Sequence, residues 1–234
     1  MLRKIESKNM GSSNIGWLRS KFHFSFSEYY NPDNINFGVL RVINDDLVES
    51  RKGFGIHPHN DMEIISYVVN GELTHGDTMG NKNTITRGHV QYMSAGTGVY
   101  HSEHNLGRDI LRFLQIWIFP DKEGYKPTYG DFRFNWDDRH NKWLHMVSSK
   151  DGNAPIKINQ DINIYSLELE KGKEISFPVN EGRQAYLVQI EGNSLINGFE
   201  LADRDGMEIV EEDILIKAKE TSHILILEMN KQEL

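Results

Sequence analysis

Apolar and aromatic residues occur along the chain in short runs that are separated by Gly, Asn and Asp. Val, Ile, Phe and Tyr dominate these runs, and each run is about as long as a β-strand. The 3.6-residue periodicity of an amphipathic helix is hard to find anywhere. Many short strands with turn residues between them predict an all-β fold, either a sandwich or a barrel. The clearest expected strands are residues 37–44, 63–70, 89–94 and 110–119.

The strand pattern stops once and then recurs. Residues 120–132, PDKEGYKPTYGDF, are rich in Pro, Gly and charge, and they predict a linker. Beyond them, AYLVQIEGNSLING at 185–198 repeats the order of residue types in ISYVVNGELTHGD at 65–77. Two copies of such a unit indicate a duplicated β-barrel rather than a solenoid. We therefore expect one domain over residues 1–133 and a second over residues 134–234.

Composition narrows the class of protein. The chain has 234 residues, a net charge of −8 and no cysteine. The acidic balance argues against direct nucleic-acid binding, which needs a basic face. Without thiolates, any metal must be held by nitrogen and oxygen ligands. The first residues lack the apolar core of a signal peptide and no apolar run is long enough to span a bilayer, so we expect a cytoplasmic protein with no membrane partner.

One stretch combines two residue types that are uncommon in strands. The segment FGIHPHND places His57 and His59 on either side of Pro58. In an extended chain, residues i and i+2 project to the same face, so both imidazoles can point into a barrel. Proline cannot donate to a strand ladder, which indicates an edge strand or a loop that enters one. A pair of this kind could bind a metal if other ligands complete the shell.

The segment GVYHSEHN repeats the same spacing with His101 and Glu103. Two such pairs on neighbouring strands would bring together three imidazoles and one carboxylate, a set that suits a first-row divalent ion and leaves two octahedral positions open. A lone H-x-H is more often a surface or hydrogen-bonded core feature. Two pairs in consecutive strands of one copy, with only His223 retained in the second copy, favour a metal site.

The other titratable residues near these pairs favour structural interpretations. His104 is out of phase with the second pair and is expected to face away from it. His75 and His89 lie beside turn glycines and are expected to be solvated. Glu63 lies four residues after His59, and the spacing leaves open whether it is a ligand, a hydrogen-bond partner of a ligand, or neither.

Four stretches of the first half resemble the pirin family of the cupin superfamily. They are GWLRSKFHFSFSEYYNPDNINFGVLRVINDD, GFGIHPHNDMEIISYVVNGELTHGDTMGN, VQYMSAGTGVYHSEHN and FLQIWIFPD, and they cover most of residues 16–121 in order. The resemblance implies a bicupin, in which an N-terminal metal-binding barrel of the jelly-roll type is followed by a degenerate, metal-free one. The family's metal ligands fall on His57, His59, His101 and Glu103, and Glu63 stays outside the shell.

The resemblance also implies a metal and a range of activities. Iron(II) is the expected ion, and manganese, nickel, cobalt, copper or zinc would accept the same ligands. Some relatives cleave flavonols such as quercetin with dioxygen and release carbon monoxide, whereas others are described as transcriptional cofactors or as binders of metabolic enzymes. Fold analogy alone does not choose between these roles.

Our leading hypothesis is a metal-dependent dioxygenase of the quercetin 2,3-dioxygenase type, acting on a planar hydroxylated aromatic. Glu103 is then the catalytic residue, since it is the only expected ligand able to take the proton of a substrate hydroxyl. The alternative is a non-catalytic metal-binding protein that modulates a transcription factor or metabolic enzyme according to metal occupancy or oxidation state. Zinc-dependent hydrolysis is a third possibility, but three histidines and a glutamate make a fuller shell than most hydrolytic zinc sites have.

Overall fold

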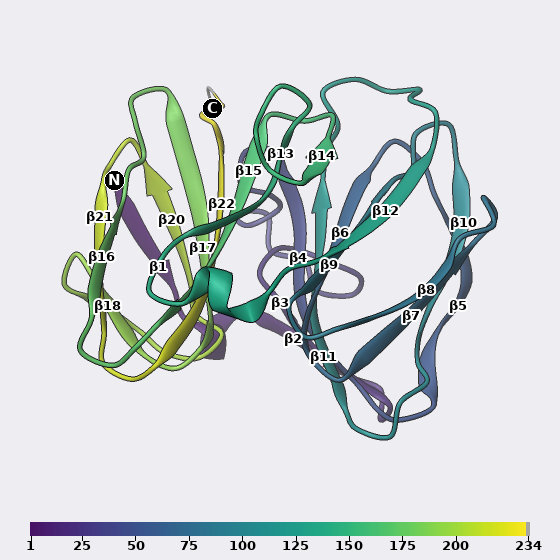
Figure 1. Ribbon diagram of the computed structural model, residues 1–234, viewed down its shortest axis with the longest axis horizontal. Helices are drawn as coiled ribbons and strands as arrows, with labels where there is room; N and C mark the ends of the chain where they lie inside the picture. Colours follow the sequence, from purple (N-terminus) through teal and green to yellow (C-terminus); the bar gives the residue numbers. More distant parts are fainter. Residues whose placement is uncertain (233–234) are drawn as a thin grey trace. The chain divides into compact units, whose positions relative to one another are not determined.

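The computed structural model describes residues 1–232 and is built almost entirely of β-strands (Figure 1). The helical elements of this part of the chain are two short 3-10 helices, η1 (Ser7–Asn9) and η2 (Trp136–Arg139). The all-β prediction is therefore confirmed. Within residues 1–232, no helix has the length and apolar character needed to cross a membrane.

The chain forms two compact units. One contains Gly11–Phe134 together with Ile158–Gln160, and the other contains Met1–Met10, Asn135–Lys157 and the chain from Asp161 onward. The first residues belong to the second unit because β1 (Leu2–Ile5) pairs with β20 (Gly206–Val210). The domain division expected between residues 133 and 134 stays a prediction.

The first unit contains a seven-stranded and a four-stranded antiparallel sheet. The larger sheet has the order β12-β9-β6-β11-β4-β3-β2. Its strands are β2 (Gly11–Asn14), β3 (Leu18–Phe22), β4 (Leu40–Val48), β6 (Glu63–Asn70), β9 (His89–Ser94), β11 (Leu111–Ile118) and β12 (Thr128–Arg133). The smaller sheet has the order β5-β10-β7-β8, formed by β5 (Lys52–His59), β7 (Glu72–Asp77), β8 (Lys82–Thr86) and β10 (Val99–Asn105).

Most expected strands of this unit are confirmed. Strands β6 and β9 have the predicted bounds, and β11 is one residue shorter at each end. Strand β4 begins at Leu40, because Phe37 and Leu40 pair across a tight turn in which Gly38 has a φ of 54°. It continues to Val48, beyond the predicted end.

The predicted linker was wrong over its last residues, because Thr128–Arg133 forms β12 and pairs along β9. A Cβ at Gly130 would lie 2.5 Å from the Tyr92 ring, so the glycine is needed for the close approach of the two strands. The same glycine makes the segment resemble a linker in the sequence.

The second unit repeats this arrangement. Its larger sheet has the order β1-β20-β17-β22-β15-β13-β14 and its smaller sheet the order β16-β21-β18-β19. The strands not yet given are β13 (Leu144–Ser149), β14 (Ile156–Ile158), β15 (Ile162–Leu169), β16 (Glu174–Phe177), β17 (Arg183–Glu191), β18 (Ser194–Ile196), β19 (Phe199–Leu201), β21 (Ile214–Ala218) and β22 (Ser222–Asn230). Strands β15 to β22 pair in the same order as β4 to β11, so the predicted duplicated jelly-roll barrel is confirmed.

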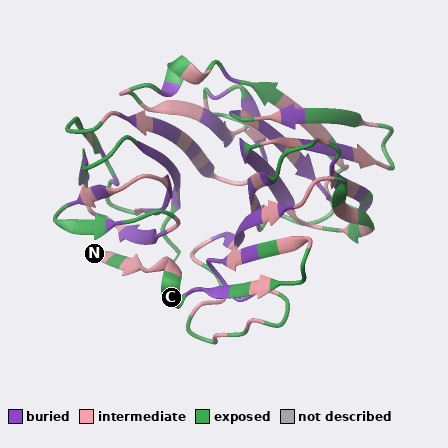
Figure 2. Cartoon of the chain, turned by 90° about the horizontal axis from the view of Figure 1, so that it is seen from below, coloured by how far each residue is buried: buried purple, intermediate pink, exposed green. Residues whose placement is uncertain are grey.

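The interiors of the two barrels differ in polarity. Buried residues follow the strands, and the connecting loops are more exposed (Figure 2). The second barrel is filled by one large apolar cluster that includes Leu187, Ile209 and Ile216. The first barrel also buries Gln91 and Glu103 among its strands. Because buried polar side chains need partners, the interior of the first barrel is where a functional site is expected.

Candidate metal centre

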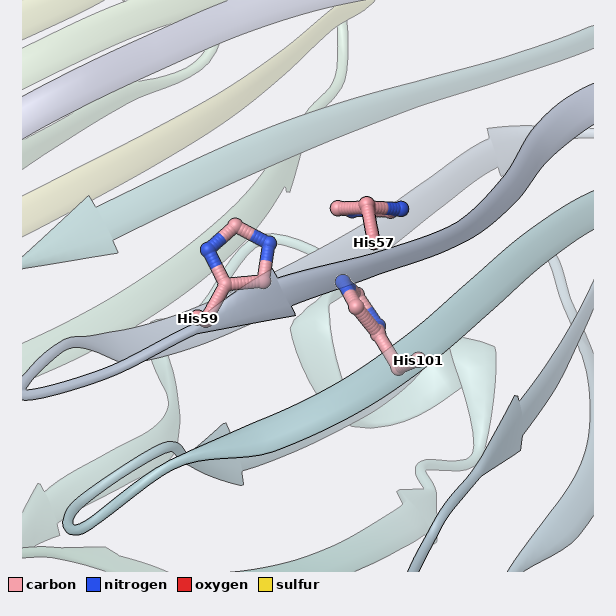
Figure 3. A group of neighbouring side chains, drawn as sticks. All are labelled: His57, His59 and His101. Atoms are coloured by element: carbon pink, nitrogen blue, oxygen red, sulfur yellow. The ribbon is translucent and has the colours of Figure 1, made fainter.

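Three predicted ligands meet on two neighbouring strands of the smaller sheet. His57 and His59 lie on β5, and His101 lies directly opposite His57 on β10. The ring centroids are 4.4 Å apart for His57 and His101, 5.0 Å for His57 and His59, and 4.9 Å for His59 and His101. One ring nitrogen from each lies within 4.8 Å of those of the other two. Figure 3 shows the three imidazoles pointing toward one another from the two strands.

The nitrogens of this histidine triad are suited to a metal ion. His101 is buried, and among residues 1–232 neither of its ring nitrogens has a hydrogen-bond partner; the same holds for Nε2 of His59. Burial, assisted by the neighbouring imidazoles, lowers the pKa of His59 to about 4 and that of His101 to about 3. Both rings are therefore neutral at pH 7, the form in which histidine binds metals.

His57 is oriented by the backbone. Its Nδ1 lies 2.7 Å from the carbonyl oxygen of Gly55, to which it donates. That hydrogen bond fixes the tautomer and leaves Nε2 with a lone pair, which is the usual arrangement in metal-binding histidines. The unused nitrogens of His59 and His101 are costly to bury unless something binds them, and a divalent transition metal fits the donor set of the three imidazoles.

Glu103 is buried in the same barrel, although a β-bulge separates it from His101 on β10. Its Oε1 accepts hydrogen bonds from Ser66 Oγ and Gln91 Nε2, both at 2.9 Å. Its Oε2 accepts from Gln115 Nε2 at 2.6 Å. Three neutral donors from the larger sheet thus hold the carboxylate. Glu103 lines the same cavity as His57 and His59. The histidines whose ligand atoms cluster with its own within 4.8 Å are His75 and His101.

His75 is the residue near the site that sequence reasoning missed. It is 1% exposed rather than solvated, so that expectation was wrong. Its Nε2 lies 2.9 Å from Asp77 Oδ2, and its ring stacks on Tyr129 with centroids 4.4 Å apart. A ligand atom from each of His75, His101 and Glu103 lies within 4.8 Å of the others. The signal was present as a third i, i+2 pair, His75 and Asp77, because β7 continues through the intervening glycine.

Glu63 has a structural role. Its Oε1 accepts from the backbone and side-chain nitrogens of Asn159 at 2.8 and 2.7 Å, and its Oε2 accepts from the backbone nitrogen of Gln160 at 2.9 Å. Burial raises its pKa despite these hydrogen bonds. Glu63 therefore anchors residues 158–160 to the first unit. His104 and His89 are each half-buried, and His89 is thus less exposed than expected.

A cavity of about 360 Å³ adjoins the triad. This volume lies within the usual range for small-molecule pockets, roughly 300–1,000 Å³. Exposed Ile15 is part of its lining, so the cavity opens to solvent. The lining combines aromatic side chains with residues of the candidate metal centre: Phe22, Phe26, Phe54, Trp117, His57, His59, Glu103 and Gln115.

Two jelly-roll barrels of the same strand order, one of them enclosing an imidazole cluster beside a buried carboxylate, define a bicupin with a candidate metal centre. The family model described as Pirin matches residues 4–118, and the model described as quercetinase C-terminal cupin domain matches residues 145–229. Together with the relatives described next, these matches show that the chain belongs to the pirin family.

Several relatives are similar over their whole length. The chain is 40% identical to a protein of Escherichia coli K12 named quercetin 2,3-dioxygenase, with 97% of each chain covered. It is also 40% identical to the pirin-like protein of Caulobacter vibrioides, over 97% of this chain and 99% of the relative. The crystal structure of YhhW from Escherichia coli superposes with a TM-score of 0.93 at 37% identity, with both chains fully covered. A second structure of bacterial pirin YhhW is a complex with nickel(II), and it covers 99% of this chain with a TM-score of 0.92.

Proposed function

We propose that the chain is a metal-dependent dioxygenase that opens the ring of a flavonol, as the name of its Escherichia coli relative indicates for that protein. The observation that supports this most is the placement of the triad. Three imidazoles, two of them with buried nitrogens that have no partner among residues 1–232, lie beside a cavity with aromatic walls that opens to solvent. A planar aromatic substrate and dioxygen could reach such a site, whereas a sealed site would favour a purely structural ion.

In this proposal His57, His59 and His101 hold the metal, and Glu103 completes the shell. When bound, a divalent transition metal supplies the Lewis-acid charge that acidifies a substrate hydroxyl and the redox chemistry that dioxygen requires. The triad comes from two paired strands, which hold the imidazoles on a rigid support. Iron(II) is the proposed native ion and the cytoplasm the proposed compartment.

Glu103 is the proposed general base of the site. It would take the proton of the substrate hydroxyl, and the donors from Ser66, Gln91 and Gln115 keep its carboxylate aimed into the cavity. An aromatic substrate that fills the cavity would displace water from it, which strengthens charge interactions inside the site.

The test is anaerobic reconstitution with iron, manganese, nickel, cobalt or copper, followed by quercetin and oxygen. We expect loss of flavonol absorbance and release of carbon monoxide with at least one ion. Glu103→Gln should lower kcat by about 10²-fold or more while metal content is retained. His104→Ala, on the outer face of β10, is the matched control and should change neither. No ring cleavage with any of the five ions would refute the flavonol activity.

One observation favours a second candidate, a non-catalytic protein that modulates a protein partner according to its metal. Both oxygens of Glu103 already accept hydrogen bonds from neutral donors, so proton uptake would disturb a completed network. An iron-loaded protein that changes oxidation state reversibly, but turns over no flavonol, would support this role. Elemental analysis of protein purified without a metal-affinity tag identifies the native ion for either function.

A further inference from the structure

A row of polar residues crosses the inner face of the seven-stranded sheet in the first barrel. Ser66 on β6 lies opposite Gln91 on β9 and opposite Gln115 on β11. Gln115 in turn lies opposite Asn44 on β4. Two residues further along β4, Asp46 lies opposite Ser20 on β3. Since alternate residues of a strand share a face, Asn44 and Asp46 face the same way.

The two halves of this row differ in how their hydrogen bonds are used. Ser66, Gln91 and Gln115 donate to Glu103, as described above. Asn44 and Asp46 are each 4% exposed and line the cavity, and within the described chain Oδ1 of each has no hydrogen-bond partner. Buried acceptors without a donor are rare in folded proteins and call for an explanation such as a ligand.

The surroundings of Asn44 and Asp46 restrict which ligand could satisfy them. The same cavity has aromatic walls that include Phe22, Phe54 and Trp117, which suit a flat apolar ring system. Two acceptor oxygens in such walls require a ligand that presents hydrogen-bond donors at its edge. A ring bearing hydroxyl groups meets both requirements.

We propose that Asn44 and Asp46 form a recognition subsite that accepts hydrogen bonds from ring hydroxyl groups of a planar aromatic ligand. This subsite is built on the seven-stranded sheet, whereas the triad is on the four-stranded sheet. The proposal rests on the proposed function for the aromatic nature of the ligand, but it does not depend on ring cleavage.

The state of Asp46 agrees with this assignment. Ser20 hydrogen-bonds to its carboxyl group, and burial is the main reason that its pKa is raised to about 7. Burial makes the ionised carboxylate unfavourable in this pocket, and a hydrogen-bond donor would stabilise it. A ligand hydroxyl aimed at Oδ1 would supply that donor.

The test is equilibrium binding to the metal-loaded protein under anaerobic conditions, so that no turnover occurs. Two probes are compared: quercetin, and 3-hydroxyflavone, which keeps the ring system and the 3-hydroxyl but lacks the other hydroxyls. The wild-type protein should bind quercetin at least tenfold more tightly. Asn44→Leu and Asp46→Leu should each weaken quercetin binding about tenfold and change 3-hydroxyflavone binding less than twofold, which removes most of the discrimination.

Asp45→Asn is the control, because Asp45 is the next residue of the same strand and pairs with Arg112. It should leave the discrimination unchanged. If a leucine variant does not fold, Asp46→Asn replaces it and should reduce discrimination at least threefold. An equal loss for both probes, no preference in the wild-type protein, or binding of neither probe would overturn the subsite. Discrimination without ring cleavage would instead defeat the dioxygenase proposal and leave the subsite standing.

Discussion

The two barrels of this chain have one strand order and opposite interiors. In the first, His57 pairs opposite His101; in the second, Phe177 pairs opposite Ile214 between the corresponding strands β16 and β21. Ile216 follows Ile214 at the i+2 position that Glu103 occupies after His101. The same scaffold therefore supports either a polar site or an apolar core, depending on a few inward-facing positions.

The two interiors also differ in how much they stabilise the fold. Every inward position of β21 is apolar and buried, and it packs into one continuous cluster. The first barrel instead buries imidazoles whose nitrogens, among residues 1–232, find no protein partner. Such groups lower stability in the absence of a ligand. The first barrel therefore has less apolar packing and a candidate binding site, whereas the second has a continuous apolar core and no such site at the corresponding positions.

The strongest test of this contrast is removal of the histidine pair that links β5 and β10. The double replacement His57→Ala with His101→Ala should weaken divalent-metal binding at least a thousandfold, about 4 kcal/mol. Isothermal titration with nickel and elemental analysis measure the effect. His104→Ala should retain full metal binding. Stoichiometric metal in the double variant would show that the triad is not the site.

The converse change places a polar group in the apolar barrel. Ile216→His should lower the free energy of unfolding by about 3 kcal/mol, because the imidazole would be buried among aliphatic side chains with no acceptor or metal. Denaturant unfolding measures this loss. Ile216→Val is the control and should cost about 1 kcal/mol. If Ile216→His were as stable as Ile216→Val, the second interior would be less tightly packed than described.

A smaller effect is expected from Asp46, the buried carboxyl group of the first barrel. Its pKa rises from 3.8 to about 7 on folding, so between these values the folded state holds a proton that the unfolded state has lost. Stability therefore falls as pH rises through this window, and the cost is complete above pH 7. Asp46→Asn removes the ionisation, for which this rise in pKa corresponds to about 4 kcal/mol at pH 8.5. The buried amide donors of the asparagine offset part of this, so the metal-free protein should be about 2 kcal/mol more stable. At pH 4.5 this gain should be absent, and a constant difference across pH would contradict the assignment.

The smallest expected effect concerns the support of Glu103. Ser66→Ala removes one of three donors to the carboxylate and should cost about 1 kcal/mol of stability in the metal-free protein. Thermal unfolding with and without metal measures it. Gln91 and Gln115 remain as donors, so metal content should be unchanged. A loss of metal comparable to that of the double histidine variant would instead make Ser66 essential to the centre.

Local patterns explain why the strands and the triad could be predicted from the sequence. Alternating and apolar runs mark β6 and β9, and the i, i+2 spacing of His57 and His59 survives in the structure because both lie on one strand. The same rule applied to His75 and Asp77 would have found a third pair. It was missed because the intervening Gly76 resembled a turn.

Features that depend on pairing between distant segments could not be predicted. Aligning the halves by Gly71 and Gly192 brings His57 near Pro178, but it carries His101 to Ser222 on β22, although β21 is the strand that corresponds to β10. Loops of different length between the strands prevent one offset from serving the whole barrel. In the sequence, Asn44 and Asp46 belong to a polar run at the end of the expected strand 37–44. Their inward orientation becomes evident only from their partners on β3 and β11.

The pairing of β1 with β20 has a consequence for biosynthesis. Ile5 can pair with Gly206 only after all the residues between them have been synthesised. Until then β1 has no sheet to join, and β20 presents an open edge to other chains until β1 pairs with it. Closure of this sheet by segments so distant in sequence favours slow, late maturation, and it makes removal of β1 a route to aggregation rather than to a smaller stable protein.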